Sequence, residues 1–224
     1  MKITVGCPVM ERAWCLPRWF EGIERQGVEV DITCLYTPSS DDTLAILNDH
    51  GVNVIHDEKQ GRPIYENEMH TWGNPITYDY MANIRNTLLD AVKATGADYF
   101  FSLDSDIVLP DGALERLLEV SQDHPGTISP AVNMLRAGTG FAWNVMSWVA
   151  PGVHAAAHRP PNPQPGDTDI LMAAMLLDKA GMEARWQFHH QGEDLGYCAD
   201  AANKGIKLWW VSDLICEHLM VKDA

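Results

Sequence analysis

Short apolar runs alternate with segments of helical spacing along most of the chain. The apolar runs predict buried strands, which cover residues 3–8, 28–36, 52–55, 97–106 and 127–134. The helical spacing predicts helices between them, which cover residues 14–26, 44–51, 78–95 and 110–122. The polar segment 58–75, which contains glycine and proline, predicts a loop. Strands that alternate with helices in this way are typical of an α/β fold, with a mostly parallel sheet flanked by helices.

The pattern changes between residues 135 and 168, where glycine and proline are frequent and no clear period is present. This segment predicts an irregular lobe without regular layers. Order returns with an apolar run at 170–177 and a helix-like tail to Ala184, followed by a helix from 193 to 205 and a last strand at 208–215. We expect a single domain with two ordered parts, 1–134 and 169–224, and the irregular segment between them.

The composition supports one ordinary globular domain and narrows its partners. The chain has 224 residues, of which 46% are hydrophobic and 21% charged, so collagen-like, coiled-coil and disordered classes are excluded. Its formal charge is −15, from 31 acidic and 16 basic side chains. That sign argues against a protein that captures nucleic acid by its phosphates. Most of the acidity is typical of a solvated surface, and a few carboxylates are available to hold a divalent cation.

The cysteines and the N-terminal residues indicate a reducing compartment. Five cysteines occur without a CxxC pair, which favours free thiols in a cytosolic protein. The first ten residues lack the apolar core and cleavage site of a signal peptide. The longest apolar run, 170–177, is far shorter than the roughly 20 residues that cross a bilayer. The sequence therefore predicts a soluble, cytoplasmic protein.

Two aspartates at the end of an aromatic-rich strand are the first candidates for chemistry. Side chains alternate along a strand, so Asp104 and Asp106 are expected on the same side of the sheet edge. Two carboxylates placed together repel each other unless a cation lies between them, which suggests a Mg²⁺ or Mn²⁺ site. A second triplet, 167–169, follows a proline run and is interpreted as loop. The alternative for Asp104 and Asp106 is that they cap a turn or a helix.

Three further residues could complete a site. Glu193 and Asp194 lie at the expected start of a helix, where they either cap the helix or remove a proton from an acceptor hydroxyl. His218 follows the last strand and could reach a metal ion held by Asp106, although a lone histidine is more often structural.

The order of these features resembles a known family. The segments that carry the resemblance are residues 7–12 (CPVMER), 82–86 (ANIRN), 97–106 (ADYFFSLDSD), 192–197 (GEDLGY) and 216–218 (CEH). Together they are similar to the GT-A fold glycosyltransferases, especially family 2, in which an Arg-Asn helix precedes an apolar strand that ends in a DxD motif. The resemblance implies a metal-dependent transfer of a sugar from a nucleoside diphosphate sugar to a hydroxyl.

The resemblance also implies roles for particular residues. Asp106 and His218 would ligate Mn²⁺ or Mg²⁺ bridging the diphosphate, and Asp104 would support that metal or contact the ribose. Asp194 or Glu193 would be the catalytic base of an inverting enzyme.

Four more residues would surround the nucleotide. Arg85 would lie near the phosphates, Ser105 would belong to the nucleotide-sugar site, and Pro8 and Glu11 would border its pocket. Residues 36–38 (YTP) replace the acidic residues that usually read the base, so the nucleobase is left open.

The acceptor and the stereochemistry are also left open by the sequence. A protein, a small molecule, a glycan or a modified nucleobase could accept the sugar, and segment 135–168 would face it, with Trp143, Trp148 and His154 as contacts. Two other functions compete with this one. A sugar-phosphate nucleotidyltransferase would usually have a glycine-rich basic loop after the first strand, and a carbohydrate-binding or nucleotide-sugar-binding module would bind without turnover.

Overall fold

The computed structural model describes residues 1–57, 75–134, 142–150, 153–156 and 165–220. Its main sheet has ten strands. They are β1 (Ile3–Gly6), β2 (Pro8–Val9), β3 (Asp31–Tyr36), β4 (Asn53–His56), β5 (Tyr99–Leu103), β6 (Ile107–Val108), β7 (Thr127–Val132), β10 (Gly166–Thr168), β12 (Ala174–Leu177) and β13 (Leu208–His218). A smaller sheet joins β8 (Val145–Ala150), β9 (Val153–Ala156) and β11 (Ile170–Leu171) in the order β11-β8-β9.

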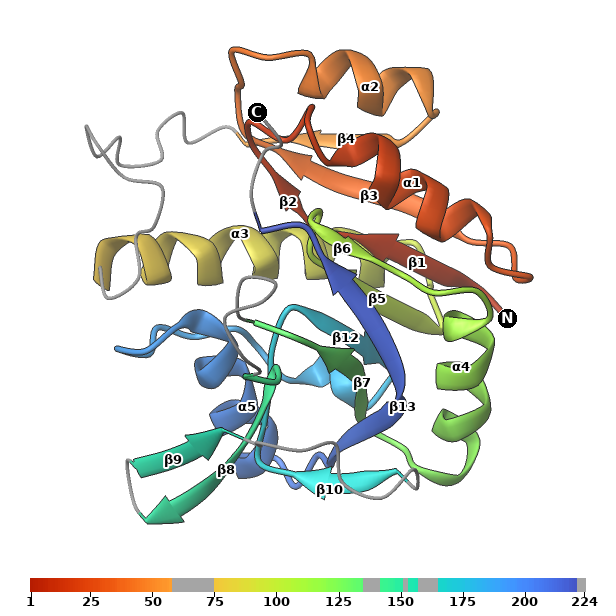
Figure 1. Ribbon diagram of the computed structural model, residues 1–224. Helices are drawn as coiled ribbons and strands as arrows, with labels where there is room; N and C mark the ends of the chain where they lie inside the picture. Colours follow the sequence, from red (N-terminus) through yellow and green to blue (C-terminus); the bar gives the residue numbers. More distant parts are fainter. Residues whose placement is uncertain (58–74, 135–141, 151–152, 157–164, 221–224) are drawn as a thin grey trace.

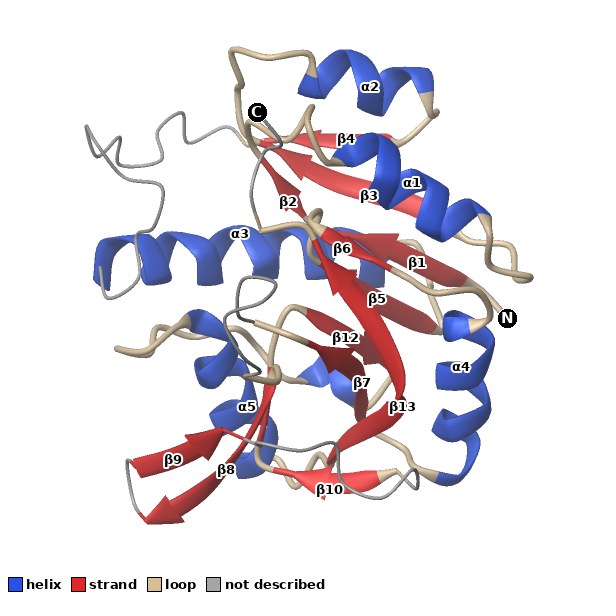
Figure 2. Ribbon diagram, viewed as in Figure 1, coloured by secondary structure: helices blue, strands red, loops and turns tan. Residues whose placement is uncertain are grey.

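The main sheet is mostly parallel, as the sequence predicts. Its order is β10-β13-β7-β12-β5-β1-β3-β2, with β4 beside β3 and β6 beside β13. Strand β1 runs parallel to both β3 and β5, and β13 runs parallel to β7. Strand β12 is antiparallel to its two neighbours, β5 and β7. Figure 2 shows this sheet crossing the molecule, with the β8–β9 hairpin to one side.

Five α-helices pack around the sheet within the described residues. They are α1 (Leu16–Glu24), α2 (Thr43–Asp49), α3 (Pro75–Ala94), α4 (Ala113–Asp123) and α5 (Glu193–Asn203). In Figure 1, α4 lies to the right of the sheet and α5 to its left, where α5 contacts α3. No described helix is long and apolar enough to cross a membrane.

The core forms because apolar side chains of the strands meet those of the helices. Phe100 and Phe101 of β5 are almost fully buried, as are Leu88 and Leu89 of α3. Burying a side chain of this size contributes about 1.5–3 kcal/mol each.

Two glycines allow the backbone to approach closely at positions that matter for the site. A Cβ atom on Gly6 would lie 1.9 Å from the carbonyl oxygen of Thr33, so only glycine lets β1 and β3 pack this tightly. A Cβ atom on Gly196 would lie 2.0 Å from the carbonyl oxygen of Gln187. Because Gly196 has no side chain, helix α5, which begins at Glu193, can pack directly against the backbone of Gln187.

The structure differs from the sequence-based expectations in several places. Pro8 does not end the first strand but begins β2, whose pairing is with β3. Segment 135–168 is not uniformly irregular, because β8, β9 and β10 lie within it. The helical tail expected up to Ala184 is a 3₁₀ turn at Gly181–Glu183. The expected loop at 58–75 lies almost entirely outside the described residues.

Candidate active site

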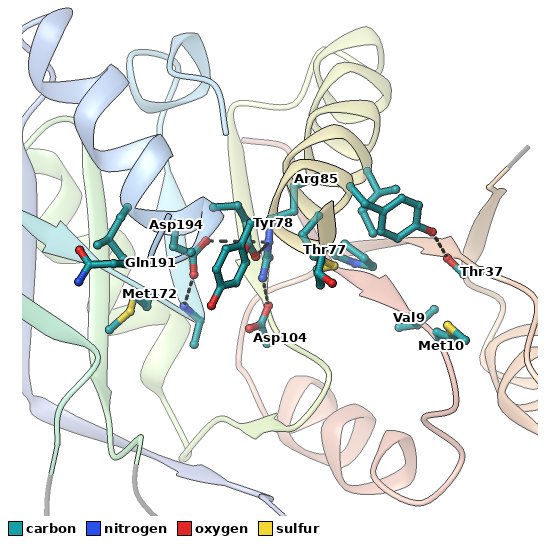
Figure 3. Close-up of a pocket in the computed structure, with 18 of the residues that line it drawn as sticks. Val9, Met10, Thr37, Thr77, Tyr78, Arg85, Asp104, Met172, Gln191 and Asp194 are labelled. Carbon is teal, nitrogen blue, oxygen red and sulfur yellow. Dashed lines mark hydrogen bonds and ion pairs between the residues drawn. The ribbon is translucent and has the colours of Figure 1, made fainter. Parts of the chain in front are cut away.

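A cavity of about 310 Å³ opens where β2, β3 and β5 end. Open parallel sheets bind their ligands at this edge. Strand β2 contributes Val9, the loop after it contributes Met10 and Arg12, and α3 contributes a wall that includes Thr77, Tyr78 and Arg85. Asp104 and the first residues of α5 lie opposite. Figure 3 shows Val9, Met10 and Thr37 at one end of the cavity and Met172 and Gln191 at the other.

Arg85 lies at the centre of a cluster of three carboxylates. Its Nη2 donates to Asp104 Oδ1 at 2.9 Å, its Nε donates to Glu193 Oε1 at 3.0 Å, and Asp194 Oδ1 lies 3.9 Å from Nε. Figure 3 shows the Arg85 side chain between Asp104 and Asp194. Burial lowers the pKa of the guanidinium, but the three carboxylates outweigh that effect and hold the pKa above its ordinary value. Arg85 is therefore a permanent charge that joins α3, β5 and α5.

Burial changes the protonation of two carboxyl groups in this cluster. It raises the pKa of Glu193 to about 7, against the opposing charge of Arg85. It also raises the pKa of Asp104 to about 6, again against Arg85. Glu193 can therefore both hold and release a proton near neutral pH.

Asp194 is fixed by hydrogen bonds to both of its oxygens. Its Oδ1 accepts from Trp186 Nε1 at 2.9 Å, and its Oδ2 accepts from the backbone N–H of Ala173 at 3.2 Å. The carbonyl oxygen of Ala173 in turn accepts from the backbone N–H of Asp104 at 2.8 Å. Ala173 adopts φ = +67°, a left-handed conformation that is unfavourable for a residue other than glycine. One strained residue therefore connects Asp104 with Asp194.

Asp104 and Asp106 do not share partners, although the sequence places them on one side of a strand. Strand β5 ends at Leu103, and a turn follows in which the N–H of Ile107 donates to the carbonyl oxygen of Asp104. Strand alternation therefore does not apply to these residues. Asp104 binds Arg85, whereas Asp106 Oδ2 lies 3.9 Å from His218 Nε2.

His218 and Asp106 are arranged as a pair that fits a divalent cation. His218 Nδ1 lies 3.1 Å from the carbonyl oxygen of Asn133, and because a carbonyl only accepts, Nδ1 carries the proton. Burial lowers the pKa of His218, but the interaction with Asp106 outweighs it and raises the pKa, because the carboxylate favours a proton on Nε2. In the neutral ring, Nε2 would instead offer its lone pair to a cation, as in histidines that ligate metals. Burial disfavours the charged form of Asp106, but the interaction with His218 outweighs it and lowers the pKa of Asp106.

This pair supplies two ligands and no more. Across the described part of the chain, no three His, Cys, Asp or Glu side chains form a group that could hold a metal ion. Mg²⁺ is commonly bound in proteins through one or two carboxylates, with substrate phosphates and water as the other ligands. The donor set of Asp106 and His218 is consistent with that mode of binding.

The residues expected to border the nucleotide lie near one another but differ in role. Pro8 lines the cavity. Glu11 instead accepts from Ser40, through the backbone N–H at 2.5 Å and the hydroxyl at 3.2 Å. Ser105 is buried, and its hydroxyl accepts from Arg12 Nε at 3.2 Å. Glu11 and Ser105 therefore hold the surrounding loops, while Pro8 and Arg12 face the cavity.

A polar group replaces the expected acidic residue at the base-reading end. The Thr37 hydroxyl lies 3.1 Å from the Tyr80 hydroxyl, which donates to Asp57 Oδ2 at 2.5 Å. Thr37 and Tyr80 line the cavity. Of the residues expected to face an acceptor, Trp143 is buried, Trp148 is partly exposed beside a second cavity, and the His154 side chain lies outside the described residues.

Four residues of the site were missed by reasoning from the sequence. Arg12 ends the segment 7–12 that carries the family resemblance but was given no role, and Tyr80 falls within an expected helix and has no motif. Ala173 gives no signal, because positive φ is expected at glycine. Trp186 reaches Asp194 from an irregular segment. Only the indole N–H, which needs an acceptor when buried, could have pointed to it.

Comparison with known proteins places this fold in a class. No family model matches the chain, and no curated protein matches its sequence. Solved structures do match. TarS from S. aureus has a TM-score of 0.62 and 15% identity, over 97% of this chain and 36% of TarS. The mannosyltransferase PcManGT from Pyrobaculum calidifontis, solved with GDP-Man and Mn²⁺, has a TM-score of 0.59 and 13% identity, over 100% of this chain and 58% of its own.

A third match agrees with these two. Glucosyl-3-phosphoglycerate synthase from Mycobacterium tuberculosis, solved with Mn²⁺, UDP and phosphoglyceric acid, has a TM-score of 0.56 and 14% identity, over 97% of this chain and 70% of its own. The chain therefore has the GT-A-like fold that its motifs suggest. It spans 36% of TarS and 58% of PcManGT, so both of those proteins contain much that has no counterpart here.

Proposed function

We propose that this protein is a glycosyltransferase that moves a sugar from a nucleoside diphosphate sugar to an acceptor hydroxyl. The observation that carries the proposal is the position of Glu193. It lines the same cavity as Asp104, at the carboxyl ends of the parallel strands, and its pKa is about 7. A carboxylate with this pKa is suited to general base catalysis at neutral pH. The GT-A-like fold supports the same conclusion.

The cavity offers an apolar end and a polar handle for the nucleotide. Val9 and Met10 provide apolar contacts at one end, beside Thr37, and Pro8 also lines the cavity. The hydroxyl of Thr77 is buried at the cavity wall, and within the described structure it has no hydrogen-bond partner. A buried hydroxyl without a partner is costly, so a ligand group that bonds to Thr77 would be favoured.

Asp106 and His218 are the residues proposed to hold Mn²⁺ or Mg²⁺. When bound, such an ion supplies positive charge that stabilises a leaving diphosphate. Asp104 is proposed to face the donor while Arg85 holds one of its oxygens. Arg85 itself is proposed to position this carboxylate and the two at the start of α5, because its charge is already matched by them.

Glu193 is the proposed catalytic base, and Asp194 is proposed to position it. Both oxygens of Asp194 accept hydrogen bonds, from Trp186 and Ala173, which makes its lone pairs less available. Glu193 accepts from Arg85 through Oε1, and its carboxyl group also interacts with its own backbone N–H and with the charge of Asp194. Its Oε2 is thus proposed to accept the proton of the acceptor hydroxyl as the hydroxyl oxygen attacks the sugar.

The proposal is tested with a panel of donors that includes UDP-GlcNAc, UDP-glucose and GDP-mannose. We expect one donor to raise the melting temperature and to be hydrolysed when Mn²⁺ is present, because a ligand that binds only the native state stabilises it. Asp106→Ala should lose hydrolysis. Asp111→Ala, an exposed aspartate at the start of α4, is the matched control and should keep it.

Two outcomes would contradict the proposal. One is a protein that neither binds nor hydrolyses any donor of the panel, with or without Mn²⁺. The other is an Asp106→Ala variant that turns the donor over as fast as the unmodified protein does.

A further inference from the structure

Arg12 differs from the other cation of the cavity in having free donors. Its Nε donates to the Ser105 hydroxyl at 3.2 Å, and its backbone N–H donates to Thr43 Oγ1 at 2.8 Å. Its terminal nitrogens make no hydrogen bond or ion pair with any residue that the structure describes, and the side chain lines the cavity. A guanidinium presents its remaining N–H groups as a planar fork that suits phosphate oxygens.

The loop that carries Arg12 is held in place by backbone hydrogen bonds to segment 39–43. Glu11, the preceding residue, adopts φ = +54°, which is unfavourable for a residue with a side chain. Its backbone N–H donates to Ser39 Oγ at 2.9 Å, and the N–H of Ala13 donates to Asp41 Oδ2 at 3.0 Å. Backbone strain that is held by several contacts is common where a side chain must be aimed at a ligand.

An anion that binds in this cavity needs a cation that is not already paired with a carboxylate. Its charged lining residues are Arg12, Arg85, Asp104, Glu193 and Asp194. Arg85 is only 6% exposed and is already paired with all three of the carboxylates, so it is not available to bind an anion. A diphosphate that entered near these carboxylates would be repelled unless a separate cation faced it.

We propose that Arg12, oriented by Ser105, binds the diphosphate of the donor directly and does so without a metal ion. The identity of the anion as a nucleoside diphosphate rests on the proposed function, whereas the geometry by itself defines a site for a small polyanion. Arg12 is thus a binding residue that neither the motifs nor the comparisons assign. It would act beside any cation held by Asp106 and His218.

The test measures the affinity for inorganic pyrophosphate, UDP, GDP and uridine by calorimetry in the presence of EDTA. We expect the unmodified protein to bind pyrophosphate and at least one of the nucleotides, and to bind uridine more weakly. Arg12→Gln should weaken pyrophosphate binding about tenfold to a hundredfold, because a hydrogen bond to a charged group is lost. Arg116→Gln on the exposed side of α4 is the matched control and should bind pyrophosphate as the unmodified protein does.

The Arg12→Lys variant shows whether affinity is lost with the guanidinium group itself or because the loop has been distorted. Lysine keeps the charge but not the planar fork, so an intermediate affinity is expected. If the Lys and Gln variants lost the same affinity, or if Arg12→Gln lost none, the proposal would be overturned. A protein that bound none of the four probes until Mn²⁺ was added would overturn it as well.

Failure of this inference can be separated from failure of the proposed function. Binding of pyrophosphate that depends on Arg12, in a protein that transfers no sugar, would leave the inference standing and remove the function. Sugar transfer with unchanged pyrophosphate affinity in Arg12→Gln would do the opposite.

Discussion

The two arginines of the cavity show how the same side chain serves two purposes. Arg85 is buried and faces three carboxylates, at 2.9, 3.0 and 3.9 Å. Arg12 is partly exposed, donates from Nε to one hydroxyl, contributes to the lowered pKa of Asp106 through its charge, and lines the cavity. A buried charge without a partner carries a large desolvation penalty, whereas a charge at a cavity wall is solvated until a ligand binds. The first arginine therefore organises the site, and the second is available to bind.

The largest effect is expected when the buried arginine is removed. Arg85→Met leaves three carboxylates without their shared cation and should lower the free energy of unfolding by about 3–5 kcal/mol. Urea denaturation at pH 8 measures this loss. The loss should shrink at lower pH, because Glu193 and Asp104 become neutral as the pH falls through about 7 and about 6. An Arg85→Met protein as stable as the parent would show that the cluster is not structural.

The next largest effect concerns the base beside Arg85. Glu193→Gln should lower kcat about a hundredfold or more, because general base catalysis is lost while the donor still binds. The base acts when deprotonated, so kcat of the unmodified protein should rise with pH through about 7 and then level off. That rise should be absent in Glu193→Gln. If Asp194→Asn removed the rise and Glu193→Gln kept it, the two roles would be exchanged.

A smaller effect is expected in the loop that carries Arg12. Burial raises the pKa of Asp41, but hydrogen bonds from Thr43 and Ala13 outweigh it and hold the pKa below its usual range. Asp41→Ala should cost about 1 kcal/mol, as for the loss of a helix cap. A lowered pKa gives stability that is present above about pH 4 and is lost as the pH falls further. The difference between the two proteins should thus vanish near pH 2, as measured by urea denaturation.

The smallest effect on stability is expected when Arg12 is replaced. Arg12→Gln should change the free energy of unfolding by no more than about 0.5 kcal/mol, as for a residue outside the core. Thermal and urea denaturation measure it beside Arg85→Met. A loss as large as that of Arg85→Met would mean that Arg12 also serves the fold.

The part of the molecule that local pattern controls was predictable from the sequence. The aromatic run before Asp104 forms β5, and the longest apolar stripe forms α3, because each buries a face of the sheet. The expected fold class is confirmed for the same reason. The hairpin of β8 and β9 escaped notice because it lies in a segment rich in glycine and proline.

The arrangement of charges was not predictable from local pattern. Arg85 and Glu193 are 108 residues apart, and no spacing rule connects them. Asp104 and Asp106 were expected together, but the strand ends at Leu103, before either of them, so its alternation does not hold there. The roles of Asp106 and His218 as metal ligands stay a prediction, supported by their separation of 3.9 Å.

Ala173 has a consequence for how substrate preference can change in this protein. Its N–H holds Asp194 and its carbonyl oxygen holds the backbone of Asp104, so one residue links two carboxylates that line the cavity. The spacing of those two carboxylates is tied to main-chain geometry, which side-chain substitutions alter little. New donors or acceptors would therefore have to be accommodated at the two ends of the cavity, near Thr37 and near Gln191.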